Sequence, residues 1–474
     1  MSDICSLTAT QAITLFKSKE LSPVELMRAI IARSEKVEPH INAFTETYFE
    51  QALHLAKESE NRYLNGTAKQ LDGVPLAVKD EFKLKGTKRT SSSLVYADQV
   101  DDTTEVIIDR LLQEGAICHA KTTTPEFCLL GSCHSRLWGV TRNPWNLETT
   151  PGGSSGGSGA ALAANTTVIA TGTDIGGSIR IPASQCGVVG YKPPYGRNPE
   201  IPVFNLDFYS HSGPMARSTQ DIALMQNIIS GHHNQDIASL RERVILDTDS
   251  SLNNLKGWKI AYSLDLDYLE IDSAVRDNTI AALKIFEDLG AQIEPVYLGW
   301  ADELIEAVHS YWSLNWANSM APLLNTHRDQ LTDYAIYFIE QASQSTPEKY
   351  NRSLEVAVET YNQFGPMMDK YDLFICPTLA TTQIPAEFTW PSSEVGMNGR
   401  IEKMDEEHWS LTYPFNMLSR CPVLSVPSGH AANNVPTGIQ LVGKTYDDRA
   451  VIEAGKAYEA AYSGLSGDLD QKLW

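Results

Sequence analysis

The sequence predicts an α/β fold whose central sheet is largely parallel or mixed. Residues 71–80, 103–115 and 116–120 follow one another as an apolar strand, an amphipathic helix and a second strand. Right-handed crossovers place such strands side by side in one sheet. The same alternation resumes with a strand at 258–262 and a helix at 273–290. Hydrophobic residues make up 42% of the 474-residue chain, which allows a substantial core.

The N-terminal residues 8–60 are predicted to be helical. Ser22 and Glu25 form a capping box, and the proline between them stands at the first helical position, a pattern typical of a helix start. The strand that follows ends in Lys79, and functional side chains gather at strand ends in α/β proteins. Residues 121–148 are predicted to form a long loop.

The later elements are predicted from apolar periodicity and from turn residues. Residues 300–370 are mainly helical and rich in aromatic side chains, which serve a core more often than a pocket. The other predicted elements are a strand at 186–190, a turn at 213–217 before a helix capped by Ser218 or Thr219, a strand at 371–377, a mobile loop at 389–407, a helix at 408–418, strands at 423–426 and 438–442, and a helix at 448–461.

Charge and cysteine content limit the possible partners and the compartment. The net charge is −21, which argues against nucleic acids or anionic membranes as partners, since both require basic patches. Seven cysteines without a CxxC pair favour a reducing cytoplasm. The N-terminus lacks a secretory signal, and no segment reaches the ~18 apolar residues of a membrane helix. A homodimer is expected from base rates alone.

Two glycine–serine clusters, at 152–157 and 176–178, mark the stretch most indicative of function. No residue from 149 to 173 is charged, so the stretch is expected to be buried backbone that approaches another group closely. A phosphate-binding loop is excluded because no Gly-Lys-[Ser/Thr] follows. An α/β-hydrolase elbow is disfavoured because residues 143–151 do not form the strand that must precede it.

The remaining explanation is a serine nucleophile activated without histidine. A lysine becomes a base if burial lowers its pKa, and Lys79 at its strand end suits this role. Ser154 is then placed to relay a proton between Lys79 and Ser178. The oxyanion would be held by backbone amides, those of Ile175, Gly176, Gly177 and Ser178.

A metal centre is disfavoured. The nearest candidates lie between residues 118 and 134, but their spacing matches no zinc pattern. These candidates are Cys118, His119, Cys128, Cys133 and His134.

The chain resembles the amidase signature family of serine hydrolases. The family pattern of GGSSGG, then GTDxGGSIRxPA, then GxKPxYGR stands at 152–157, 172–183 and 190–197. Flanking matches at 73–80, 213–217, 422–427 and 438–443 extend the resemblance over nearly the whole chain apart from about 230–400.

The resemblance implies a fold and a domain organisation. The fold is one large α/β/α sandwich, with a mixed, mostly parallel twisted sheet covered by helices on both faces. Residues 1–474 form a single domain. Within it lie an N-terminal helical layer (1–70), a signature core (71–230), a variable helical region around the substrate pocket (231–400) and a C-terminal return to the sheet (401–474).

The resemblance also implies the chemistry, which is hydrolysis of a non-peptide carboxylic amide through a covalent acyl-enzyme, without cofactor or metal. Ser178 is the nucleophile, Ser154 is the bridging serine after a cis peptide, and Lys79 is the base. Ser155 is expected to support this network. Asp174 and Arg180 are expected to pair beneath the oxyanion loop and hold it rigid.

A stand-alone amidase acting on a small amide is favoured over the glutaminase subunit of tRNA-dependent amidotransferases. That subunit has glutamine where this chain has Ile181, and residues 198–202 also depart from its pattern. An amide-forming acyltransferase and a glutaminase subunit stay open as alternatives. Candidate pocket residues are Cys133, His134, Trp138, Tyr195, Trp316, Tyr413, Phe415 and Arg420, the last as a partner for a substrate carboxylate.

Overall fold

The computed structural model describes residues 4–201, 204–248, 254–391 and 393–464. Pro202, parts of the variable region and the end of the C-terminal return therefore lie outside the described residues. One continuous sheet of eleven strands runs through the described part of the chain, in the order β1-β3-β2-β6-β8-β7-β14-β15-β11-β9-β10. The strands are β1 (Phe44–Thr47), β2 (Pro75–Lys79), β3 (Ile117–Thr122), β6 (Ile169–Thr173), β7 (Val189–Lys192), β8 (Ser212–Ala216), β9 (Lys259–Tyr262), β10 (Gln292–Pro295), β11 (Leu373–Pro377), β14 (Val423–His430) and β15 (Pro436–Val442).

The sheet is mixed, as predicted. Parallel pairings form two blocks, β3-β2-β6 and β11-β9-β10, and antiparallel pairings through β8, β7, β14 and β15 join them. The α/β class predicted from the sequence is confirmed.

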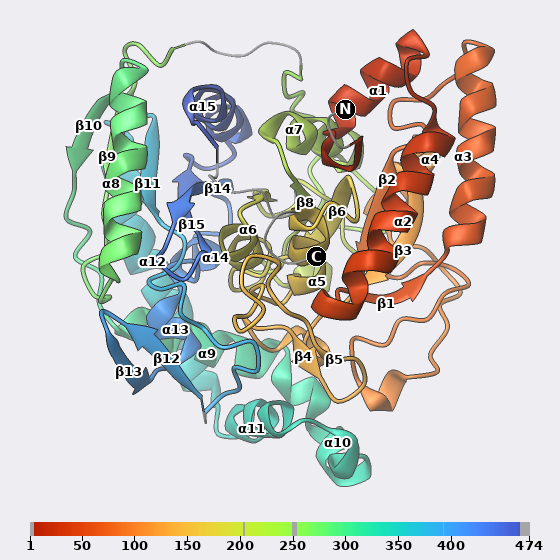
Figure 1. Cartoon of the computed structure of the whole chain (residues 1–474). Helices are drawn as coiled ribbons and strands as arrows, with labels where there is room; N and C mark the ends of the chain where they lie inside the picture. The colour runs from red at the N-terminus through yellow and green to blue at the C-terminus, as the bar shows by residue number, and fades with distance from the viewer. Residues whose placement is uncertain (1–3, 202–203, 249–253, 392, 465–474) are drawn as a thin grey trace.

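Helices cover both faces of the sheet (Figure 1). On one face the core includes residues of α1, α4, α7, α8 and α15, and on the other α5 and α6 pack against the strands around β6. The helices are α1 (Ala9–Ser18), α2 (Pro23–Ile41), α3 (Phe49–Leu64), α4 (Val106–Gln113), α5 (Gly156–Ala163), α6 (Arg180–Cys186), α7 (Thr219–Ile229), α8 (Ser273–Asp288), α9 (Glu303–Asn315), α10 (Ala321–Thr326), α11 (Asp333–Ala342), α12 (Pro347–Met368), α13 (Glu406–Trp409), α14 (Pro414–Met417) and α15 (Asp448–Ala461).

Two predicted helix starts are confirmed. The Ser22 hydroxyl accepts from the backbone N–H of Glu25, whose carboxylate accepts from the N–H of Ser22. Ser218 caps α7 by accepting from the N–H of Asp221. These side chains satisfy amide donors that a helix N-terminus leaves without partners.

Several predicted element boundaries are wrong. Cys186 ends α6 instead of beginning a strand, because Gly187 closes the helix in the left-handed conformation (φ 68°). Residues 213–217, predicted as a turn, belong largely to β8 in the middle of the sheet. The helix predicted at 408–418 is split into α13 and α14, and Pro414, which lacks a backbone donor, starts the second one.

The segment predicted as a mobile loop at 389–407 contains a β-hairpin. Strands β12 (Glu394–Met397) and β13 (Arg400–Lys403) pair in antiparallel fashion around Asn398 and Gly399, which both have positive φ. An Asn-Gly pair between strands is a strong hairpin signal. The predicted loop at 121–148 likewise holds a short ladder of β4 (His134–Ser135) and β5 (Gly139–Val140).

Residues 231–400 do not form one unit, because β9, β10 and β11 belong to the central sheet and α8 packs on it. Helices α9, α10 and α11 lie together with the β12–β13 hairpin at the bottom of the molecule in Figure 1. Within the described residues, no helix combines the length and the apolar composition that a membrane crossing requires.

Candidate active site

Alternation along β2 determines where Lys79 points. Leu76 and Val78 belong to the core on one face of the sheet, whereas Ala77 packs with residues of α5 and α6 on the other. Successive side chains of a strand point to opposite faces, so Lys79 lies on the same face as Ala77. There it reaches Ser154, which stands just before α5.

Three oxygen atoms surround the Lys79 ammonium, which is fully buried. Nζ donates to Ser154 Oγ at 2.7 Å and to Thr173 Oγ1 at 2.5 Å. The Glu81 Oε2 atom lies 3.1 Å from Nζ and forms an ion pair with it. Lys79 is therefore held between two hydroxyl groups and one carboxylate.

The electrostatics of Lys79 differ from the expectation that burial lowers its pKa. Burial does act in that direction, but Cys128 and Glu81 outweigh it and raise the pKa of Lys79 above its ordinary value. Burial raises the pKa of the Cys128 thiol to about 12, so the thiol is neutral near pH 7. The charge that keeps Lys79 protonated in the free enzyme is therefore the Glu81 carboxylate.

Ser154 and Ser178 approach one another through the backbone. The Gly153–Ser154 peptide bond is cis, and the backbone N–H of Ser155 donates to the carbonyl oxygen of Ser178 at 3.2 Å. The hydroxyl of Ser155 contacts the backbone of Thr173. Within the described part of the chain, no hydrogen bond joins the Ser178 hydroxyl to Ser154. The geometry thus brings Lys79 and Ser154 together and leaves the Ser178 hydroxyl free to turn toward a substrate.

Asp174 and Arg180 pair as predicted beneath the 174–178 loop. Arg180 Nε lies 2.9 Å from Asp174 Oδ2, and Nη2 lies 2.8 Å from Oδ1. Both side chains are fully buried. Burial opposes the charged carboxylate, but Arg180 and Asn416 outweigh it and hold the pKa of Asp174 well below its usual range. The Asn416 amide donates to the same carboxylate.

The loop amides divide into two groups, which corrects the predicted oxyanion site. The N–H of Gly177 donates to Asp174 Oδ1 at 2.9 Å, so it is already engaged and helps to fix the loop. Among the residues described, the amides of Ile175, Gly176 and Ser178 donate to no protein acceptor. The fourth predicted donor, the N–H of Gly177, is therefore already taken, and the other three amides remain open to another acceptor.

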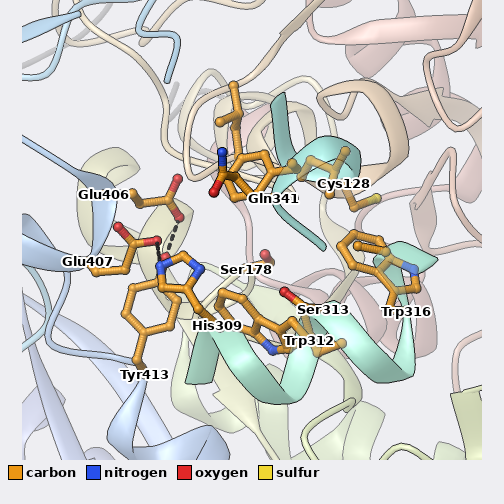
Figure 2. A pocket seen from close by; sticks show the side chains of 16 residues that line it. Cys128, Ser178, His309, Trp312, Ser313, Trp316, Gln341, Glu406, Glu407 and Tyr413 are labelled. Carbon is orange, nitrogen blue, oxygen red and sulfur yellow. Dashed lines mark hydrogen bonds and ion pairs between the residues drawn. The ribbon is translucent and has the colours of Figure 1, made fainter. Parts of the chain in front are cut away.

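A cavity opens above Ser178 (Figure 2). Its walls combine aromatic side chains with a cluster of two acidic residues and a histidine. Helices α9 and α11 supply one part, and the segment around α13 supplies another. The lining residues are Cys128, Leu129, Leu130, Ile175, Gly176, Ser178, His309, Trp312, Ser313, Trp316, Ala317, Phe338, Gln341, Glu406, Glu407 and Tyr413.

The polar wall of the cavity is acidic. Glu407 Oε1 forms an ion pair with His309 Nε2 at 2.7 Å. Glu406 accepts from the backbone N–H of Gly131 at 2.5 Å and from the Tyr413 hydroxyl at 2.8 Å. Burial, reinforced by the neighbouring Glu407, raises the pKa of Glu406 to about 7. Despite burial, His309 holds the pKa of Glu407 below its ordinary value, and Glu407 raises that of His309.

Only two of the eight predicted pocket residues, Trp316 and Tyr413, line this cavity. Cys133 is fully buried against Gly156, and Phe415 packs in the core with Trp300 and Phe374. The other four lie elsewhere: His134 bonds the carbonyl oxygen of Phe388, Trp138 donates to Thr90, Tyr195 donates to the carbonyl oxygen of Asn205, and Arg420 lies over the rings of Tyr195 and Phe208.

Arg420 lines a different pocket, together with residues of α12 and of the loop before α15. It does not line the cavity above Ser178, which removes the structural basis for its predicted role with a substrate carboxylate. The conceivable metal ligands at 118–134 are not brought together either. Within the described residues, no group of three or more His, Cys, Asp or Glu side chains is placed to hold a metal ion.

Sequence reasoning missed two sets of residues. Glu81 and Thr173 surround Lys79. Strand alternation could not place the Glu81 side chain, because β2 ends at Lys79 and Glu81 stands in the turn after it. The second set gives the cavity its polarity and shape: His309, Trp312, Phe338, Gln341, Glu406 and Glu407. No local pattern distinguishes these side chains from core or surface residues of helices.

Comparison with known proteins adds independent findings. The model of the Amidase family matches residues 25–452. A protein named acylamidase from Rhodococcus erythropolis is 33% identical over 462 residues, covering 96% of this chain and 95% of the relative. A glutamyl-tRNA(Gln) amidotransferase subunit from Caldanaerobacter subterraneus is 28% identical, covering 97% of each chain. The crystal structure of a bacterial aryl acylamidase of the amidase signature enzymes superposes with a TM-score of 0.88 at 28% identity, covering 96% of each chain.

Proposed function

From the premise that the chain belongs to the amidase family, we propose how it hydrolyses a carboxylic amide: Ser178 is the nucleophile, Ser154 relays its proton and Lys79 is the base. One observation carries this assignment. The fully buried Lys79 Nζ lies 2.7 Å from Ser154 Oγ, on the face of the sheet where the Ser178 cavity opens. A lysine base and a serine relay replace the histidine of other serine hydrolases.

The reaction proceeds in two halves. Neutral Lys79 takes a proton from Ser154, which takes the proton of Ser178 as its oxygen attacks the amide carbon. The amides of Ile175, Gly176 and Ser178 stabilise the oxyanion, and each well-placed donor contributes about 3–4 kcal/mol. The proton returns to the leaving nitrogen as the C–N bond breaks. Water then attacks the acyl-enzyme through the same relay and releases the acid.

The cavity supports a preference for amides that carry an aromatic or apolar group. Trp312, Trp316 and Phe338 offer apolar surface close to Ser178, and burial of such surface favours binding. Glu407 and His309 form an ion pair whose charges cancel. Glu406 adds a negative charge to the polar wall when its carboxyl is ionised, so a substrate carboxylate is repelled. We assign a small, neutral or positively charged amide, and the two relatives named as acylamidases support this class.

The alternatives differ in acceptor or in partner. The match to the amidotransferase subunit supports a glutaminase reading, but Ile181 stands where that subunit has glutamine. An acyltransferase would use the same Ser178 ester with an amine in place of water. We place the enzyme in the cytoplasm because none of the seven cysteines forms a disulfide in the described structure, as suits a reducing compartment.

A fluorophosphonate probe tests the nucleophile without a known substrate. Wild type is expected to gain one adduct by intact mass, and Ser178→Ala is expected to gain none. Ser353→Ala removes another buried serine hydroxyl, from α12, and should label like wild type. An adduct that persists in Ser178→Ala would overturn the assignment of the nucleophile.

A substrate screen then separates the alternatives. Ammonia or amine release is measured for neutral aryl and acyl amides and for glutamine, with and without hydroxylamine as an acceptor. If ammonia or amine is released from aryl or acyl amides at a rate that hydroxylamine does not change, the result supports the hydrolase function. Turnover of glutamine alone would favour the amidotransferase subunit, and accumulation of hydroxamate in place of acid would favour the transferase.

A further inference from the structure

Glu81 is placed beside the base of the reaction by the geometry of β2. The strand ends at Lys79, and the chain continues so that Glu81, two positions later, returns to the same side. Its Oε2 atom lies 3.1 Å from Lys79 Nζ. The mechanism above gives this carboxylate no task, although it is the only acidic group in direct contact with Lys79 in the described structure.

A chain of hydrogen bonds links the two side chains. Lys79 Nζ donates to Thr173 Oγ1 at 2.5 Å, and the same hydroxyl donates to Glu81 Oε2 at 2.5 Å. Lys79 therefore has a hydroxyl group on each of two sides. Ser154 leads toward the nucleophile, and Thr173 leads toward the carboxylate.

In the free enzyme, Lys79 must lose a proton before it can act as a base, and neither Ser154 nor Ser178 can take that proton. Glu81 forms an ion pair with Lys79 Nζ and helps to raise the pKa of Lys79 above its ordinary value, so Lys79 is protonated in the free enzyme and cannot accept a proton. Before Ser178 can attack, one proton must leave Nζ. Bulk water is a poor destination because Lys79 is fully buried, and the nearest base is Glu81.

We propose that Glu81 takes this proton and so acts through Lys79 as the residue that generates the neutral base. The step is a relay through Thr173. One N–H proton of Lys79 moves to Thr173 Oγ1 while the hydroxyl proton of Thr173 moves to Glu81 Oε2. An ammonium and a carboxylate become an amine and a carboxylic acid, and no other reactant is consumed. This proposal rests on the function proposed above.

Substrate binding supplies the driving force for the relay. A substrate in the cavity displaces water, and removal of water disfavours an ion pair relative to the neutral pair. The Glu81 side chain is 22% exposed in the free structure, so its carboxyl can exchange protons with solvent between turnovers. The pair thus stores one proton during the acylation step and recovers the ion pair afterwards.

Other titratable groups near Glu81 do not replace it. Cys128 is close to both Lys79 and Glu81, but burial raises the pKa of its thiol to about 12. Glu105 and Glu200 influence Glu81 from a distance, and burial raises their pKa values to about 7 and about 8. Neither Glu105 nor Glu200 forms a direct hydrogen bond or ion pair with Lys79 among the contacts of the described residues. The Cys128 thiol does contact Lys79, but it is already protonated and cannot take the proton.

The pH dependence of fluorophosphonate labelling tests the proposal. Lys79 holds the pKa of Glu81 below its ordinary value despite burial, and Glu81 helps to hold that of Lys79 above its own. The pair therefore keeps one proton throughout pH 6–9, and the labelling rate of wild type should be flat there. In Glu81→Gln the carboxylate is lost, burial lowers the pKa of Lys79, and the rate should fall about tenfold per pH unit below that pKa.

Matched variants separate the relay from a structural role. Thr173→Val breaks the relay at similar size while Glu81 still holds Lys79 protonated, so labelling should slow at every pH, whereas Thr173→Ser keeps the hydroxyl and should label like wild type. Glu105→Gln removes a neighbouring carboxyl outside the relay and should also stay flat. If Glu81→Gln does not fold, the two Thr173 variants and Glu81→Asp, which keeps the carboxylate, decide the question.

Four results would overturn the proposal. The first is a wild-type labelling rate that itself rises tenfold per pH unit from pH 6. The second is a labelling rate of Glu81→Gln equal to that of wild type, and the third is a rate of Glu81→Gln above that of wild type at pH 6. The fourth is a loss of labelling rate in Glu81→Gln that is the same at every pH. The third would mean that Glu81 only keeps Lys79 charged. If wild type takes no label, or Ser178→Ala still takes it, the proposed function fails instead.

Discussion

Asp174 and Arg180 are joined by two parallel hydrogen bonds of 2.9 and 2.8 Å, and both side chains are fully buried. The same carboxylate accepts from the backbone N–H of Gly177. Arg180 also donates to the carbonyl oxygen of Thr412 and to Gln440. The pair thus connects the nucleophile loop to α6, to the segment before α14 and to β15, which makes the oxyanion site depend on distant parts of the chain.

Replacement of Asp174 by Asn should therefore affect both stability and activity. Breaking a buried ion pair on one side leaves an uncompensated charge, which costs about 3–5 kcal/mol. We expect the free energy of unfolding at pH 7 to fall by that amount, and labelling of Ser178 to slow because Gly177 loses a charged acceptor. Urea denaturation and fluorophosphonate kinetics measure the two effects.

The pH dependence of this pair has a definite sign. Because the folded pKa of Asp174 is depressed, its stabilisation is complete above the unfolded value near 4 and is lost only as pH falls through the lower folded value. Asp98→Asn, on a side chain 96% exposed, is the control and should change neither quantity. An Asp174→Asn protein as stable as wild type at pH 7 would contradict the prediction.

Ser154→Ala should slow labelling of Ser178 far more than Ser155→Ala. Ser154 is the direct partner of Lys79, and loss of a general-base relay costs on the order of 10²–10⁴ in rate. Among the described residues, the Ser155 hydroxyl forms hydrogen bonds only with the Thr173 backbone, at 3.3 and 3.4 Å, so its removal should cost about tenfold or less. Equal effects of the two substitutions would show that Ser154 does not carry the proton.

Arg420→Ala should leave the turnover of every amide unchanged, including amides with a carboxylate. Arg420 lies against Tyr195 and Phe208 in another pocket. The measurement is KM for paired substrates that differ only in a carboxylate. Trp312→Ala serves as the positive control, since it removes a wall of the cavity and should raise KM. A rise in KM for the acidic substrates alone in Arg420→Ala would restore its predicted role.

Binding of a positively charged amide should strengthen between pH 6 and 8. The pKa of Glu406 is about 7, so its carboxyl gains a negative charge over this range and attracts the cation. We expect kcat/KM to rise with pH for the cationic amide more than for a neutral one of equal size, and Glu406→Gln should remove the difference. Glu348→Gln, at the exposed start of α12, should preserve it, and an identical rise for both substrates would refute the idea.

The glycine–serine motifs located Ser154, Ser178 and the Asp174–Arg180 pair because each depends on residues close in sequence. Capping and turn chemistry are local as well, which is why Ser22 and Ser218 begin helices where predicted. The Asn398-Gly399 hairpin was also readable, but its short strands carry little apolar alternation.

The cavity could not be derived in the same way. His309 and Glu407 pair across almost a hundred residues of chain, and neither has a neighbour in sequence that marks its role. Phe415 and Trp316 are both aromatic residues of the C-terminal half, yet Phe415 packs against Phe374 in the core and Trp316 lines the cavity. Tertiary packing alone decides which face of each helix becomes a wall.

The cavity walls and the proposed catalytic residues come from different segments of the chain, which affects how substrate specificity can evolve. The residues proposed for the proton path and the nucleophile lie between positions 79 and 178, whereas most of the walls come from α9, α11 and the stretch around α13. We expect substitutions in these helices to change which substrates bind while the proposed catalytic residues stay unaltered. New substrate specificities can then arise by substitutions in a part of the chain that holds none of the proposed catalytic residues. Exchange of residues 303–342 between relatives should transfer substrate preference without transferring the catalytic rate.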